Sequence, residues 1–119
     1  MNIEYSLNSM VIPRFTIDHT IFLEGFKKQG FIWHIGAVNR CTFIQSEKSL
    51  QIGTVLDLYY QEETHRLNFL SIQCVSAFSI LNWDELFRDK APELPEHFIS
   101  LLLGVIYSSL RGVIIDRTA

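Results

Sequence analysis

The chain has 119 residues, the size of one ordinary domain. Hydrophobic residues make up 48% of it and charged residues 19%, so it has enough apolar residues for a core and is not of disordered composition. Its net charge is −3 and its basic residues are scattered, which argues against nucleic acid as a partner. A domain of this size leaves roughly a third of its unfolded surface exposed. We therefore expect surplus apolar side chains to meet a partner, and the protein to be a homo-oligomer or a binder of apolar ligands.

Cysteines and targeting signals indicate the compartment. Cys41 and Cys74 lie far apart and form no CxxC motif, which fits a reduced environment. Glu4 stands where a signal peptide carries positive charge, so we expect a cytoplasmic protein. The apolar stretch from Phe98 to Ile115 contains serines and Arg111, and it predicts a buried helix of a soluble protein with no membrane insertion.

The first two thirds of the chain alternate apolar and polar residues, the pattern of β-strands. In residues 2–12 the alternation slips phase near Asn8, which predicts a β-bulge. Ile21 and Leu23 continue the period of two beyond Pro13, and residues 24–30 form a polar connection bounded by glycines.

More strands follow along the chain. They are expected in residues 31–44, with Asn39 and Arg40 between two β-prone parts, in residues 52–60 and in residues 66–80. Gln61 to His65 are polar and predict a hairpin tip. Strands together occupy about residues 2–80.

Helices are predicted in the last third of the chain. Asn82 before Trp83, with Glu85 as the third residue after it, has the pattern of a capping box and predicts a short helix over about residues 83–90. Pro95 opens a long helix over about residues 95–116. Because this helix is apolar nearly all round, it needs cover on more than one side.

Small residues recur at every fourth position of the long helix and form one narrow stripe: Ser100, Gly104, Ser108 and Gly112. Such a stripe lets another backbone approach closely. The helix either lies tightly on its own sheet or packs on its copy in a second subunit. Both interpretations remain open, because the stripe requires only some close partner.

Motifs for catalysis, metal binding and nucleotide binding are absent from the sequence. It has no HxxxH, HxH, GxGxxG, Walker GK[ST] or GxSxG pattern. We therefore expect no metal, no cofactor and no catalysis. One enzyme alternative stays open: Asp18 and His19 as acid and base in a cone-shaped α+β enzyme of the ketosteroid-isomerase type. Neighbouring strand residues point to opposite faces, so these two would share a pocket only at a bulge.

Several segments occur in a distinctive order. Leu67 to Val75 lead into Ala77-Phe78-Ser79-Ile80, an acidic-aromatic segment follows, and the long helix ends in Tyr107 to Gly112. Upstream lie Ile21 to Phe26. In this order the segments resemble the SecB family of protein-export chaperones, and the resemblance covers most of the chain.

The resemblance implies an α+β subunit in which a long C-terminal helix packs on one face of a four-stranded antiparallel sheet. It also implies a homo-oligomer, a dimer or tetramer assembled partly through those helices. The implied function is an ATP-independent holdase that binds unfolded or non-native polypeptide in apolar grooves, in protein export or for one dedicated partner.

Client binding is assigned by this resemblance to four aromatic residues that match the family's loop and second strand: Phe22, Phe26, Phe31 and Trp33. Family members continue past the element that matches Arg111-Gly112 with a second helix, and some end in a zinc tail. This sequence ends at Ala119, so we expect a more open client groove. A structural homo-oligomer without client binding is a further alternative.

Overall fold

Four strands and one helix lie in the described part of the first 82 residues, and two helices lie in the described part that follows. The computed structural model describes residues 2–27, 33–88 and 91–118. Its chain divides into two compact units, Met1–Asn82 and Trp83–Ala119. The elements of the first unit are β1 (Tyr5–Ile17), α1 (His19–Lys27), β2 (Trp33–Ile44), a 3-10 turn (Gln45–Glu47), β3 (Ser49–Glu62) and β4 (His65–Ile80). Those of the second unit are α2 (Trp83–Phe87) and α3 (Glu96–Thr118). The expected α+β class, with a four-stranded antiparallel sheet and a long C-terminal helix, is confirmed.

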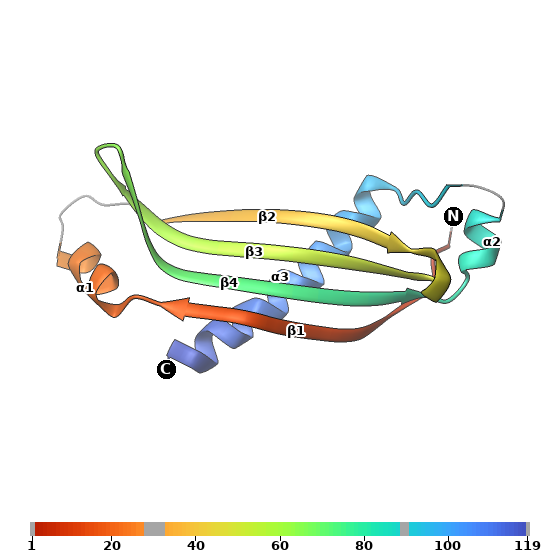
Figure 1. The fold of residues 1–119 in the computed structure, drawn as a ribbon, viewed down its shortest axis with the longest axis horizontal. Coiled ribbons are helices and arrows are strands. Elements are labelled where there is room, and N and C mark those ends of the chain that lie inside the picture. Colours follow the sequence, from red (N-terminus) through yellow and green to blue (C-terminus); the bar gives the residue numbers. More distant parts are fainter. Residues whose placement is uncertain (1, 28–32, 89–90, 119) are drawn as a thin grey trace. The chain divides into compact units, whose positions relative to one another are not determined.

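The strand order in the sheet is β1-β4-β3-β2, so β3 and β4 are central and β1 and β2 form the edges (Figure 1). All three pairings are antiparallel. A two-residue turn at Glu63 and Thr64 joins β3 to β4, and Glu63 has a left-handed φ of 54°. The polar hairpin tip is therefore confirmed.

One face of the sheet carries the core. Alternate side chains of the two central strands are buried there: Leu50, Ile52, Leu56 and Tyr60 from β3, and Leu70, Ile72, Cys74, Phe78 and Ile80 from β4. Each large aliphatic side chain removed from water contributes about 1.5–3 kcal/mol. This burial fixes the register, because a slip by one residue would turn the whole set to the other face.

Two irregularities bend β1. The register shifts between Leu7 and Ser9, so the bulge predicted near Asn8 is confirmed, and the Asn8 side-chain amide donates to the Ser79 hydroxyl. A second shift lies between Val11 and Arg14 and contains Pro13, which has no N–H to give to the ladder.

Residues 19–27 form a helix, so the prediction of extended structure at Ile21 and Leu23 was wrong. The reason is the side chain of Asp18, whose Oδ1 accepts the backbone N–H of Ile21 at 3.0 Å. This is the hydrogen bond of a helix N-cap, and it satisfies an amide at the start of α1. The Asp18 amide itself donates to the Phe69 carbonyl at 2.8 Å and ties the helix start to β4.

Asn82 precedes α2 as predicted, but its side chain is engaged elsewhere. Its Oδ1 accepts the Glu4 amide at 2.9 Å, and its Nδ2 donates to the Asn2 carbonyl at 2.8 Å. The capping role is therefore replaced by a clamp that holds the start of the chain to the end of β4.

α3 begins where Pro95 accepts the amides of Phe98 and Ile99 at 3.0 and 3.2 Å. One row of its side chains is buried, at every fourth position: Phe98, Leu102, Ile106 and Leu110. Leu101 and Ile115 are large and exposed. Within this chain α3 is therefore fully buried along one row, and not on more than one side as expected. By length and composition alone, Glu96–Arg117 is also apolar enough to cross a membrane, a property that core helices of soluble proteins share.

The N-cap of α1 can be tested directly. We expect Asp18→Ala to destabilise the helix by about 1 kcal/mol, because it leaves the Ile21 amide without its acceptor. Asp18→Asn keeps an acceptor and is the matched control. Hydrogen exchange at the amides of α1 should accelerate in the alanine variant only, and equal exchange in both variants would contradict the cap.

Candidate functional site

The sheet face opposite the core carries a band of exposed valines. Strand pairing places Val11 opposite Val75 and Val75 opposite Gly53, and the same row ends at Arg40. The next row, two residues along each central strand, runs Arg14, Gln73, Val55, Val38. Four valines therefore form a diagonal across all four strands, with an arginine at each remaining corner.

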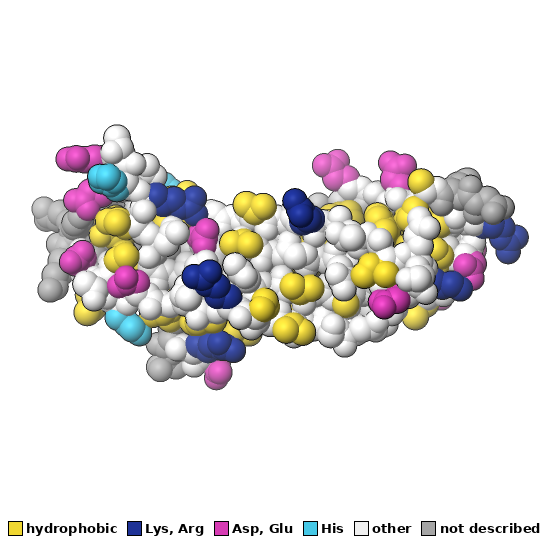
Figure 2. Space-filling model, viewed as in Figure 1, with side chains coloured by type: hydrophobic (Ala, Val, Ile, Leu, Met, Phe, Trp, Pro, Cys, Tyr) yellow, Lys and Arg dark blue, Asp and Glu magenta, His cyan; other side chains and the backbone are white. Residues whose placement is uncertain are grey.

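These four side chains are open to solvent: Val11 is 56% exposed, Val38 71%, Val55 37% and Val75 38%. Figure 2 shows hydrophobic side chains gathered over the middle of the sheet, with basic ones beside them. Single exposed hydrophobics are ordinary, whereas contiguous ones mark an interaction surface. We call this surface, Val11, Val38, Val55 and Val75, the valine band.

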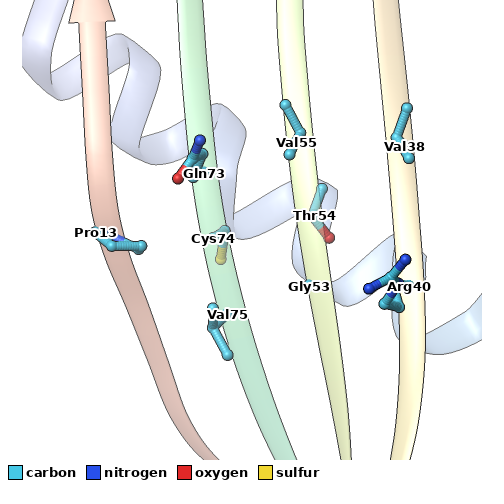
Figure 3. A pocket seen from close by; sticks show the side chains of 9 residues that line it. All are labelled: Pro13, Val38, Arg40, Gly53, Thr54, Val55, Gln73, Cys74 and Val75. Atoms are coloured by element: carbon cyan, nitrogen blue, oxygen red, sulfur yellow. The ribbon is translucent and has the colours of Figure 1, made fainter.

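A shallow depression of about 330 Å³ lies within the band. It is lined by Pro13, Val38, Arg40, Gly53, Thr54, Val55, Gln73, Cys74 and Val75 (Figure 3). Gly53 creates it, because this position between Val75 and Arg40 has no side chain to fill the surface. A Cβ built there would meet its nearest neighbour, the Arg40 carbonyl oxygen, at 4.0 Å, so the space is free.

The charges around the depression are positive. None of its lining residues is acidic, and Arg40 is exposed. Within the part of the chain that the structure describes, the Arg40 and Arg14 guanidinium groups make no ion pair or hydrogen bond. In a chain with a net charge of −3, this face offers two uncompensated cations beside apolar side chains.

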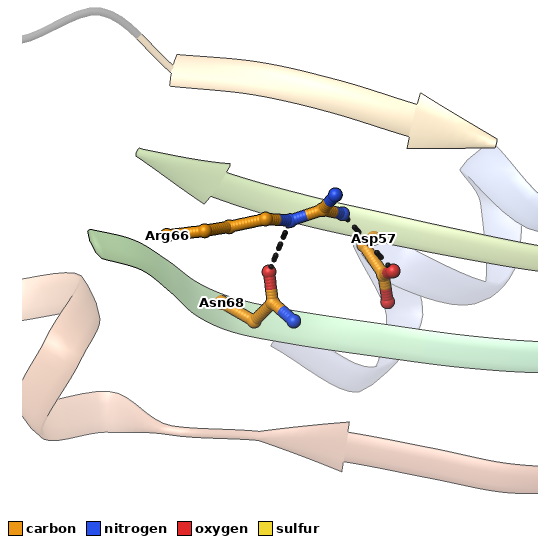
Figure 4. A network of polar contacts seen from close by, with 3 residues as sticks. All are labelled: Asp57, Arg66 and Asn68. Atoms are coloured by element: carbon orange, nitrogen blue, oxygen red, sulfur yellow. Dashed lines mark hydrogen bonds and ion pairs between the residues drawn. The ribbon is translucent and has the colours of Figure 1, made fainter. Parts of the chain in front are cut away.

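Arg66, on the same face, differs from Arg40 and Arg14 because its guanidinium has partners within the protein. Arg66 forms an ion pair with Asp57 at 3.1 Å and donates from Nε to Asn68 Oδ1 at 3.0 Å (Figure 4). Its guanidinium lies 3.7 Å from the centroid of the Tyr59 ring, and His34 stacks on that ring at 5.3 Å. Arg66 is therefore already ion-paired, whereas Arg40 has no ion pair among the described residues.

The four aromatics proposed for client binding fall in three places. Phe22 and Phe26 belong to α1, so Phe26 is in a helix and not in the polar connection that was predicted. Trp33 is the first residue of β2, and Phe31 lies outside the described residues. Their role as a client-binding set stays a prediction.

The small-residue stripe lies on the exposed side of α3. Ser100, Gly104, Ser108 and Gly112 are all exposed, and each is two residues from a member of the buried row. Among the described residues, and apart from the adjacent residues and the local helix backbone, no atom lies within 4 Å of a Cβ built at Gly104 or Gly112. The stripe therefore faces open space.

Asp18, the carboxylate of the enzyme alternative, is exposed and caps α1. Among the described residues no three His, Cys, Asp or Glu side chains cluster as metal ligands would. Both cysteines are free, and partial burial raises the pKa of the Cys41 thiol.

The valine band was not among the sites predicted from the sequence. Its signal is present, because Val11, Val38, Val55 and Val75 occupy the strand phase opposite the core residues. An alternating strand is normally polar at those positions. Recognising the band requires the register, which brings four separate valines into adjacent rows.

Comparison with known proteins gives no family. No protein-family model matches the chain, and no curated protein matches it. Among solved structures, the chain is similar to a protein of unknown function from Streptococcus agalactiae. The identity is 12% and the TM-score 0.28, over 96% of this chain and 90% of that one.

Two glycines on the exposed face give a matched pair of variants. We expect Gly53→Ala to stabilise the protein by roughly 0.5–1 kcal/mol, because alanine suits a strand better than glycine and the space is free. At Gly36 a Cβ would meet Arg66 Nη2 at 3.1 Å and Tyr59 Cε1 at 3.3 Å. Gly36→Ala should therefore force these two side chains to shift by a few tenths of an ångström and give no such gain. Urea unfolding measures both, and equal stabilisation would contradict the packing described.

Proposed function

We propose that the protein is a non-catalytic, ATP-independent client-binding module that holds unfolded or non-native polypeptide. The observation that carries the proposal is the valine band with its open depression. Unfolded chains offer aliphatic side chains, and a contiguous apolar surface binds them by the hydrophobic effect. The resemblance of the sequence to SecB chaperones supports the same function and leaves open whether the role lies in export or with one dedicated partner.

The shape of the band suits an extended segment. Four strands are separated by three spacings of about 4.8 Å, so the band extends roughly 14 Å across the strands. About four residues of extended chain cover that distance. Because the depression is shallow and open, a segment can lie across it without entering an enclosed cavity.

We further propose that the protein is a homo-oligomer, a dimer or tetramer, that assembles through the small-residue stripe of α3. Exposed apolar residues beside the stripe, such as Leu101, support this, as does the open space at Gly104 and Gly112. Of the two interpretations of the stripe, these observations favour packing on a second copy.

Client holding is tested by aggregation. The wild-type protein should slow the aggregation of a chemically unfolded model protein when the two are mixed in near-stoichiometric amounts without ATP. The double variant Val38→Ser, Val55→Ser should lose most of this effect while remaining folded, because both side chains are exposed. Leu81→Ser, which removes an exposed aliphatic side chain outside the band, is the control. Full protection by the double variant would refute the assignment of the site.

Oligomer formation is tested by native mass. Gly104→Leu and Ser108→Leu should lower the mass of the assembly, since a bulky residue prevents close helix contact. Gly104→Ala keeps a small side chain and should leave the mass unchanged. An unaltered mass in both leucine variants would contradict assembly through the stripe.

A further inference from the structure

We propose that the depression at Gly53 selects peptide segments in which an acidic side chain neighbours aliphatic ones, with Arg40 binding the carboxylate. This inference rests on the proposed function and deepens it by naming the class of client segment. It concerns a site within the first unit alone, built by β2, β3 and β4 with Pro13 of β1.

The apolar half of the site is supplied by valines. Val38 and Val55 are direct neighbours on one side of Gly53, and Val75 is its neighbour on β4. Figure 3 shows their side chains around the depression. The space left by the missing Cβ of Gly53 can receive a client's aliphatic group, because the nearest atom outside the adjacent residues, the Arg40 carbonyl oxygen, is 4.0 Å from that position.

The polar half is supplied by Arg40, with the Gln73 amide on the opposite side of the depression. Arg40 neighbours Gly53 directly across β2 and β3. A guanidinium presents a fork of donors that matches a carboxylate in a bidentate pair. Arg66 shows what a satisfied arginine looks like on this face, since it has Asp57, Asn68 and the Tyr59 ring as partners. Arg40 has no such partners among the described residues, so its donors are available to a ligand.

Charge complementarity decides which client is favoured. A basic segment would meet uncompensated arginines at both ends of the band, Arg14 and Arg40, with no acidic side chain lining the depression. A neutral aliphatic segment would gain only the apolar contact. A segment with Glu or Asp beside aliphatic residues uses both halves of the site.

The test uses two labelled unstructured peptides that differ only in one residue, Glu or Gln, within an aliphatic segment. The fluorescence anisotropy of each labelled peptide is measured as wild-type protein is added. It should give about fivefold tighter binding of the Glu peptide, as expected of an exposed ion pair. The preference should shrink with added salt. Arg40→Gln should remove the preference, so that the two peptides bind with equal affinity. Arg111→Gln, at an exposed arginine of α3, is the control and should keep the preference.

Gly53→Val provides an independent readout, because its side chain occupies the depression, where a Cβ has its nearest neighbour, the Arg40 carbonyl oxygen, at 4.0 Å. It should weaken both peptides equally. Equal affinity of the wild-type protein for the two peptides would overturn the inference and leave the proposed function standing. A preference that survives Arg40→Gln would overturn it as well. So would displacement of the peptide by a fatty acid, decanoate, at a decanoate concentration below the peptide's own Kd. Binding of neither peptide would count against the proposed function itself.

Should Arg40→Gln fail to fold, two other measurements test whether Arg40 binds the carboxylate. They are the salt dependence of the preference and the variant Arg40→Lys, which keeps the charge but loses the fork of donors.

Discussion

The pairing of β3 with both of its neighbours is the constraint on which the first unit depends. Ile52, Thr54 and Leu56 turn to the buried face, and the residues between them, Gly53 and Val55, must then turn to the exposed face. The same register aligns Gly53 with Val75 and Arg40, and Val55 with Gln73 and Val38. Core burial therefore determines the composition of the opposite surface. The valine band and its depression follow directly from the alignment that buries the core.

An exposed apolar sheet face makes a protein prone to association, and the proposed client binding would explain why this one is kept. Exposed β-branched side chains on a sheet invite association, and natural sheets usually place charged or polar residues at such positions. Here four valines occupy them, and Gly53 weakens a central strand by omitting a side chain. A surface that holds apolar segments of another chain requires both features, since it needs exposed apolar area and room for an incoming side chain.

Much of the fold could be predicted from the sequence, because long alternating runs and a long apolar helix are strong signals. The bulge at Asn8 was readable as a phase slip. The helix α1 was missed because Ile17, Ile21 and Leu23 fit an extended pattern, and the decisive feature was the single hydrogen bond from Ile21 to Asp18. Asn82 shows the converse: its sequence context is that of a cap, while its amide is used by Glu4 and Asn2, which are distant in sequence. The valine band depends on strand order and register, which alternation along one strand does not specify.

Methyl-resolved NMR of the protein with an unfolded client tests the central claim most directly, because the band is defined by valine methyl groups. The account predicts that the methyl resonances of Val11, Val38, Val55 and Val75 shift or broaden on binding, while those of the buried Ile52 and Ile72 change little. Perturbations that leave these four valines unaffected and appear elsewhere, or no perturbation at all, would contradict it.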